Sequence, residues 1–242
     1  MMKMPLLLLP GTLCTEQLWA HQIENLSDIA EVKVGDLTTE PTIQGMAKYV
    51  LDHAPERFFL AGLSLGGIVA IEIMRQAPER VLKLALLDTT ANPPRPEQLD
   101  TWTQFIDMSN NGKFLEVTKE RLLPHLIYQQ HPMKERLSAT IIEMAECIGK
   151  DAYINQVKAV MTKPNGFDVL PNIQCSTLLL VGREDALCTV RMHEEMKREI
   201  PHADLVIIED CGHLSSIEQP ETVTKVFRKW LTTELDEIGE GL

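Results

Sequence analysis

The sequence predicts an α/β fold: a doubly wound, mostly parallel sheet of about six strands with an inserted α-helical segment. Short, continuously apolar runs alternate with longer stretches whose apolar residues recur at helical spacing. Continuously apolar strands are typical of a parallel sheet that helices cover on both faces. The alternation stops between residues 92 and 166, where no clear strand occurs.

Six apolar runs are the expected strands. They are the segments 6–9, 31–35, 57–62, 81–87, 177–181 and 204–208. Helical spacing predicts helices between or after these strands, at residues 16–26, 42–53, 65–76, 190–200 and 222–231. Parallel strands joined through helices are connected by right-handed crossovers, which place the helices on both faces of the sheet.

Residues 92–166 are predicted to form a helical cap insertion, which leaves residues 1–91 and 167–242 as the core. A Pro-rich stretch (93–96) opens the segment and Lys163-Pro164-Asn165-Gly166 closes it, and such clusters mark breaks between elements. Helices are expected at 98–110, 112–123, 133–148 and 152–161. The alternative is that these helices only extend the helical layer of the core. The acidic end from Glu234 is expected to fray.

The composition excludes several classes of partner. There are 23 Lys and Arg residues against 35 Asp and Glu residues, and an acidic surface repels nucleic acid and anionic membranes. No apolar run approaches the roughly 20 residues that cross a bilayer, and the run 6–9 is too short for a signal peptide. Five scattered cysteines without CxxC spacing favour reduced thiols and a cytoplasmic protein. No metal-binding motif occurs, so neither a metal nor another cofactor is expected.

The segment Gly62-Leu63-Ser64-Leu65-Gly66-Gly67 lies between a predicted strand and a predicted helix. A turn this tight strains its central residue, lifts the Ser64 hydroxyl above the sheet and directs the helix N-terminus at it. The backbone N–H of Leu65 is then a candidate oxyanion donor. A glycine-rich turn with an incidental serine is the simpler alternative. A phosphate loop fits less well, because no Gly-Lys-Ser/Thr follows.

A serine hydroxyl needs a base to remove its proton. Among the seven histidines, His213 is the candidate, because it follows Cys211-Gly212 just after the last apolar strand, at the sheet edge where Ser64 is expected. An acid must then orient the imidazole. Asp185 follows the strand 177–181 and is favoured because the chain order becomes Ser, Asp, His. Asp88 and Glu184 remain alternatives.

These motifs, together with Leu9-Pro10-Gly11-Thr12, resemble the α/β-hydrolase superfamily, and more narrowly its small, capped carboxylesterase and acyl-transfer members. The resemblance covers nearly the whole chain except residues 92–166. It implies a second oxyanion donor in the loop after the first strand, most naturally the N–H of Thr12, with Leu13 as its neighbour. The chain departs from the family pattern in placing Pro10 where His is common, and in starting at what resembles the family's third strand.

The predicted function is serine hydrolysis of a carboxylic ester or thioester through an acyl-enzyme on Ser64, with a small-molecule acyl substrate. Apolar residues of the cap, such as Trp102, Met108 and Met133, are candidates for an acyl pocket. The same motifs also fit C–C hydrolysis, lyase chemistry or a cofactor-free peroxidase, because a fold hosts many reactions. A non-catalytic ligand receptor on this scaffold is a further alternative. The oligomeric state does not follow from the sequence.

Overall fold

One parallel sheet forms the centre of the molecule. The computed structural model describes residues 3–233, so the expected frayed end from Glu234 lies outside the described residues. The sheet has the order β2-β1-β3-β4-β5-β6, and every neighbouring pair of strands is parallel. The strands are β1 (Met4–Leu9), β2 (Ala30–Val34), β3 (Phe58–Leu63), β4 (Val81–Leu87), β5 (Ser176–Gly182) and β6 (Asp204–Ile208). The predicted fold class is confirmed.

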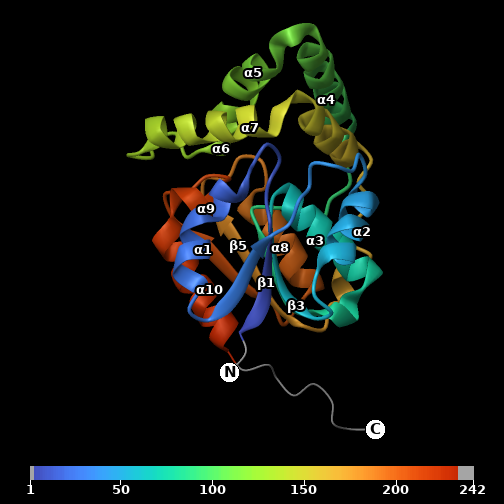
Figure 1. The fold of residues 1–242 in the computed structure, drawn as a ribbon, viewed down its shortest axis with the longest axis vertical. Helices are drawn as coiled ribbons and strands as arrows, with labels where there is room; N and C mark the ends of the chain where they lie inside the picture. The colour runs from blue at the N-terminus through green and yellow to red at the C-terminus, as the bar shows by residue number, and fades with distance from the viewer. Residues whose placement is uncertain (1–2, 234–242) are drawn as a thin grey trace.

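Helices cover both faces of this sheet (Figure 1). On one face pack α2 (Ile43–His53), α3 (Leu65–Gln76) and α8 (Val190–Glu199), and on the other α1 (Ala20–Leu26) and α10 (Pro220–Thr232). Successive side chains of a strand point to opposite faces. In β1, Leu7 and Leu9 accordingly join the first core cluster, whereas Leu6 and Leu8 join the second. Both faces of the central strands are buried, which explains why β1, β3, β4 and β5 are mostly apolar along their length. The edge strand β2, by contrast, exposes Glu31 and Lys33.

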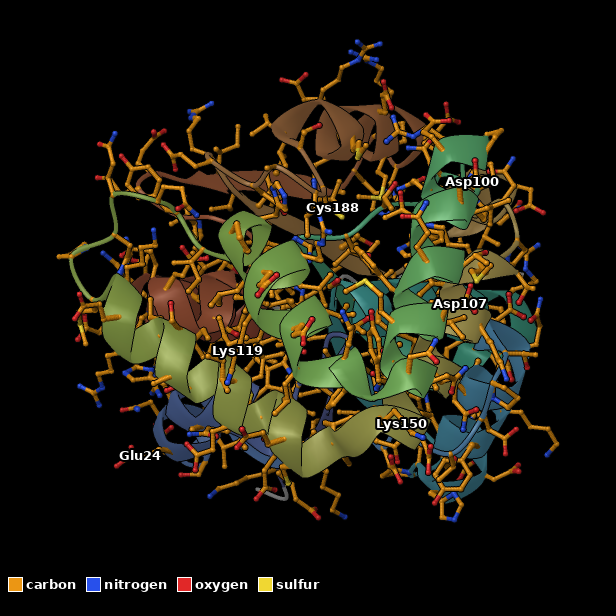
Figure 2. The ribbon with its side chains drawn as sticks, turned by 90° about the horizontal axis from the view of Figure 1, so that it is seen from above. Glu24, Asp100, Asp107, Lys119, Lys150 and Cys188 are labelled. Carbon is orange, nitrogen blue, oxygen red and sulfur yellow. The ribbon has the colours of Figure 1, made fainter. Side chains whose placement is uncertain are left out.

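The chain between β4 and β5 forms helices that lie over the carboxyl ends of the strands (Figure 1). They are α4 (Pro96–Met108), α5 (Phe114–Glu116), α6 (Leu123–Leu126) and α7 (Lys134–Met161), with the irregular turns η3 (Ser109–Lys113) and η4 (Val117–Leu122). Seen from above, the exposed charged residues labelled on these helices include Asp100, Asp107, Lys119 and Lys150 (Figure 2). That residues 92–166 form a separate cap domain remains a prediction.

Two glycines break the helical backbone close to where the expected helices end. Gly112, at the start of the expected helix 112–123, has φ 80°, a left-handed conformation, and beyond it short α- and π-helical segments run to Leu126. Gly149 has φ 78° and a non-helical backbone inside α7, so α7 consists of two helical stretches that correspond to the expected helices 133–148 and 152–161. Of the helices within residues 3–233, none has both the length and the apolar character needed to cross a membrane.

Candidate active site

Ser64 sits at a strained turn between β3 and α3. Its backbone has φ 55° and ψ −116°, which is unusual for a residue with a side chain. A Cβ on Gly62 would collide with the backbone of Gly66, and a Cβ on Gly66 would collide with the backbone of Leu9. Only glycine fits these two close approaches. Ser64 occupies the N-cap position of α3, but its hydroxyl makes no capping hydrogen bond. The hydroxyl can therefore bond to other side chains.

The structure brings Ser64, His213 and Asp185 together in one hydrogen-bonded row. The Oγ atom of Ser64 lies 2.9 Å from Nε2 of His213, and Nδ1 of His213 lies 2.8 Å from Oδ2 of Asp185. The other oxygen of Asp185 accepts the N–H groups of Leu187 and Cys188 at 2.8 and 2.9 Å. The two backbone donors fix the carboxylate, which in turn fixes the imidazole with Nδ1 protonated and Nε2 free to accept from the serine.

Burial and charge act in opposite directions on this pair. Asp185 and His213 are only 4% and 3% exposed. Burial raises the pKa of Asp185, but the His213 charge and the hydrogen bonds to Oδ1 and Oδ2 outweigh it and lower the pKa below its usual value. Burial likewise lowers the pKa of His213, whereas Asp185 raises it, with a net increase. Asp185 is thus ionised while His213 is poised to take up a proton.

Neither rival acid is hydrogen-bonded to His213. Asp88, fully buried after β4, accepts the Gly182 N–H at 2.9 Å and the Ser215 hydroxyl at 2.5 Å. Burial, followed by the nearby Asp185 charge, raises the pKa of Asp88. Glu184 accepts the N–H of Cys211 at 2.8 Å. Both acids therefore hold backbone near the row of three. Of the three candidate acids, Asp185 is the one hydrogen-bonded to the imidazole.

The two predicted oxyanion donors, Thr12 and Leu65, belong to the two segments that meet at Ser64. Leu65 is the first residue of α3, and within residues 3–233 its N–H donates to no other protein group. The same holds for the N–H of Thr12. A Cβ placed on Gly11 would lie 3.5 Å from Cβ of Ser64, which shows how closely the loop after β1 passes the serine.

The model of the Alpha/beta hydrolase family matches residues 18–226 of the 242. The chain belongs to this family. The hydrolase is 25% identical to a pimeloyl-[acyl-carrier protein] methyl ester esterase of Nitrosomonas europaea, over 92% of this chain and 93% of that protein. It is 26% identical to a 2-hydroxy-6-oxononadienedioate/2-hydroxy-6-oxononatrienedioate hydrolase of Burkholderia vietnamiensis, over 72% of this chain and 62% of that protein.

Solved structures agree with the fold. A thermophilic esterase from Thermogutta terrifontis superposes with a TM-score of 0.84 at 29% identity, covering 94% of this chain and 89% of its own. An enol-lactonase from Burkholderia xenovorans also has a TM-score of 0.84, at 21% identity, covering 96% of this chain and 93% of its own. The family, the fold and the hydrolase class predicted from the sequence are confirmed.

Sequence reasoning missed Gln156, which holds the loop that carries Thr12 through a hydrogen bond to Leu13. The side chain of Gln156, on α7, accepts the N–H of Leu13 at 3.0 Å and donates to the carbonyl of Leu37 at 3.2 Å. The amide of Leu13 is thereby occupied, which leaves Thr12 as the available donor of this loop. A polar residue in a helical stretch carries no sequence signal for such a contact, because its partners are more than a hundred positions away in the chain.

A second group that sequence reasoning missed is linked to Ser64 through Thr89, whose hydroxyl donates to the Ser64 carbonyl. His193 of α8 is fully buried, and burial lowers its pKa to about 4. Its Nδ1 atom donates to the carbonyl of Thr189 at 3.1 Å, so Nε2 accepts the N–H of Thr89 at 3.3 Å. Thr89 follows the carboxyl end of β4, the edge at which functional residues of such sheets gather. The place of Thr89 just after a predicted strand is the one sequence signal that points to this pair of residues.

Metal-ligand chemistry fits this site poorly. Within the described residues, Asp185, Cys188 and His213 offer ligand atoms within 4.8 Å of one another. Both oxygens of Asp185 already accept hydrogen bonds. Burial, followed by the Asp185 charge, raises the pKa of Cys188 well above its ordinary value, which disfavours the thiolate that a metal needs. The arrangement suits proton transfer.

Proposed function

We propose that this hydrolase cleaves carboxylic esters or thioesters through an acyl-enzyme formed on Ser64. The observation that carries the proposal is the row of contacts from Oγ of Ser64 through His213 to Asp185, at 2.9 and 2.8 Å. A hydroxyl within hydrogen-bond reach of a base, which is itself oriented by a third group, is the arrangement that activates a serine.

The reaction has two halves. Nε2 of His213 takes the proton of Ser64 as Oγ attacks the carbonyl carbon, and then passes it to the departing alkoxide or thiolate. In the second half His213 removes a proton from water, which attacks the acyl carbon and releases the acid. Asp185 stays ionised throughout and stabilises the imidazolium. The N–H groups of Thr12 and Leu65 hold the negative oxygen in both halves.

Support for the proposed substrate class comes from apolar residues packed beside the loop of Thr12. Leu13, next to Thr12, packs into the apolar cluster of the helices between β4 and β5, with Trp102, Met108 and Met161 among its partners. An apolar cluster beside this loop favours a small to medium apolar acyl group, bound as a small molecule. Met133, by contrast, is 45% exposed and does not belong to this cluster. Relatives named as esterases support the reaction class. The cytoplasmic placement rests on the sequence.

Labelling with a fluorophosphonate tests the acyl-enzyme. We expect one equivalent to react, at Ser64, and both Ser64→Ala and His213→Ala to lose labelling and ester turnover. Asn110→Ala, at an exposed position on η3, is the matched control that retains both. A folded wild-type protein that is not labelled at Ser64 would refute the proposal. A chain-length series of p-nitrophenyl esters then identifies the acyl group.

Hydrolysis of a C–C bond next to a carbonyl is the second candidate. The relative named as a 2-hydroxy-6-oxononadienedioate hydrolase is the observation that favours it. It uses the same groups, with a carbanion in place of the alkoxide as the leaving group. A screen that finds turnover of β-diketones or vinylogous diketones and none of esters would select it. Lyase, cofactor-free peroxidase and ligand-receptor activity are the remaining outcomes of the same screen.

A further inference from the structure

One buried carboxylate holds the backbone on both sides of His213. Glu218, at the end of α9 (Ser215–Glu218), is 3% exposed. Its Oε2 atom accepts the N–H of Gly212 at 2.9 Å, and its Oε1 atom accepts the N–H of Leu214 at 3.0 Å. Hydrogen bonds from backbone donors to a carboxylate are among the stronger ones in proteins. Glu218 thus fixes the peptide units that carry the imidazole.

The same carboxylate also binds the helical segment above the sheet. Oε2 of Glu218 accepts the N–H of Tyr128 at 2.9 Å, and the N–H of His213 donates to the carbonyl of Leu126 at 3.2 Å. Nδ1 of His131 accepts the N–H of Met133, so its Nε2 donates to the backbone carbonyl of Glu218 at 3.0 Å. A Cβ on Gly212 would collide with the backbone of Tyr128. The loop of His213 and the chain after α6 therefore lie in direct contact.

Four titratable groups lie close enough to His213 to interact with its charge. Asp185 after β5, Asp88 after β4 and Glu218 on α9 each raise the pKa of His213 against the lowering effect of burial. His193 on α8 is the fourth group, and a positive charge on His213 lowers the pKa of His193 by repulsion. Burial raises the pKa of Glu218, but the three N–H groups oppose this shift by stabilising its charged form.

We propose that Glu218 is a positioning residue of this enzyme, which holds the His213 loop against residues 126–128 and so couples the placement of these helices to the orientation of the base. The inference rests on the proposed role of His213 as that base. Glu218 touches no reacting atom, and it acts through three backbone hydrogen bonds and its charge.

The test is Glu218→Gln, which keeps the shape and removes the charge. The Nε2 group of glutamine would meet at least one of the three N–H donors, so the loop should shift. We expect kcat to fall on the order of 10-fold or more with KM little changed. NMR titration of the His213 ring in the full chain should show a lower pKa than in the wild type, because a negative charge near the imidazolium is lost.

Two variants complete the experiment. Glu221→Gln, on the exposed start of α10, is the matched control and should leave both kcat and the His213 titration unchanged. Glu218→Asp keeps the charge but shortens the side chain, and should lower kcat while His213 titrates near its wild-type pKa. This variant also serves if Glu218→Gln does not fold.

An unchanged His213 titration in folded Glu218→Gln, or an unchanged kcat, would overturn the inference. These outcomes differ from a failure of the proposed function. If Ser64→Ala kept full activity, the acyl-enzyme would be refuted, whereas the NMR comparison of His213 reports on Glu218 without any substrate.

Discussion

The hydroxyl of Thr89 donates a 2.7 Å hydrogen bond to the backbone carbonyl of Ser64. That carbonyl also accepts the N–H groups of Gly67 and Ile68, at 3.0 and 3.1 Å, as α3 begins. The Thr89 side chain occupies the space that a Cβ on Gly67 would need. Thr89, held in turn by His193, therefore stabilises the strained conformation that presents the Ser64 hydroxyl.

Thr89→Val should slow acylation without impairing substrate binding. Valine matches threonine in shape but lacks the hydroxyl, so the Ser64 carbonyl loses one of its three donors. We expect kcat to fall roughly 10-fold, since small displacements of a nucleophile are costly, with KM little changed. Thr89→Ser keeps the hydroxyl and should recover most of kcat. Equal losses in the valine and serine variants would show that packing, not the hydrogen bond, matters.

Asp185→Asn should be far more damaging than Asp88→Asn. Asparagine at 185 no longer stabilises the imidazolium and favours the wrong tautomer of His213, for which a loss of roughly 10³- to 10⁴-fold in kcat is expected. Asp88 contacts Gly182 and Ser215 but not the imidazole, so its amide variant should lose much less. Steady-state kinetics on the two variants decide between the acids, and the reverse order would assign the role to Asp88.

The pH dependence of kcat/KM should report the titration of His213. The base must be neutral, and its pKa lies above the ordinary value of 6.5 because Asp185 outweighs the effect of burial. Activity should therefore be complete at high pH and fall about tenfold per pH unit once the pH drops below the raised pKa. Asp185, whose pKa is lowered, stays ionised through this range. A profile that is flat over roughly pH 5 to 9 would exclude His213 as the base.

Gln156→Leu should weaken both stability and acylation. The buried N–H of Leu13 and carbonyl of Leu37 would each lose a partner, which costs about 1–3 kcal/mol in the free energy of unfolding. The loop that carries Thr12 would also lose its anchor, so the rate of fluorophosphonate labelling should fall. Gln104→Leu, exposed on α4, is the control for adding a leucine to these helices. A destabilised variant with unchanged labelling would limit Gln156 to a structural role.

Thiol reagents should modify the native enzyme without inactivating it. Cys147 is exposed, whereas Cys14, Cys188 and Cys211 are buried, and burial raises the pKa of Cys14 to about 12. We expect one fast-reacting thiol, removed by Cys147→Ser, with ester turnover retained after labelling. Rapid inactivation that an ester substrate slows would instead place a reactive cysteine at the site.

The features predicted well from the sequence are those that local patterns encode. Continuous apolar runs mark strands buried on both faces, and Gly62-Leu63-Ser64-Leu65-Gly66 marks a turn that only glycines allow. In residues 92–166 two of the expected helices end at 110 and 148, close to Gly112 and Gly149, where the backbone is not helical. The π-helical winding of residues 117–122 was not predicted, because apolar spacing does not distinguish it from an α-helix.

By itself the sequence determined the α/β fold and three candidates, Ser64, Asp185 and His213, because each follows a strand and the carboxyl ends of parallel strands share one edge of the sheet. Tertiary structure decided that Asp185, and not Asp88 or Glu184, touches the imidazole. It also decided that Gln156, Thr89 and Glu218 hold the surrounding loops. These contacts join residues far apart in the chain, and their geometry exists only once the sheet and its helices have packed.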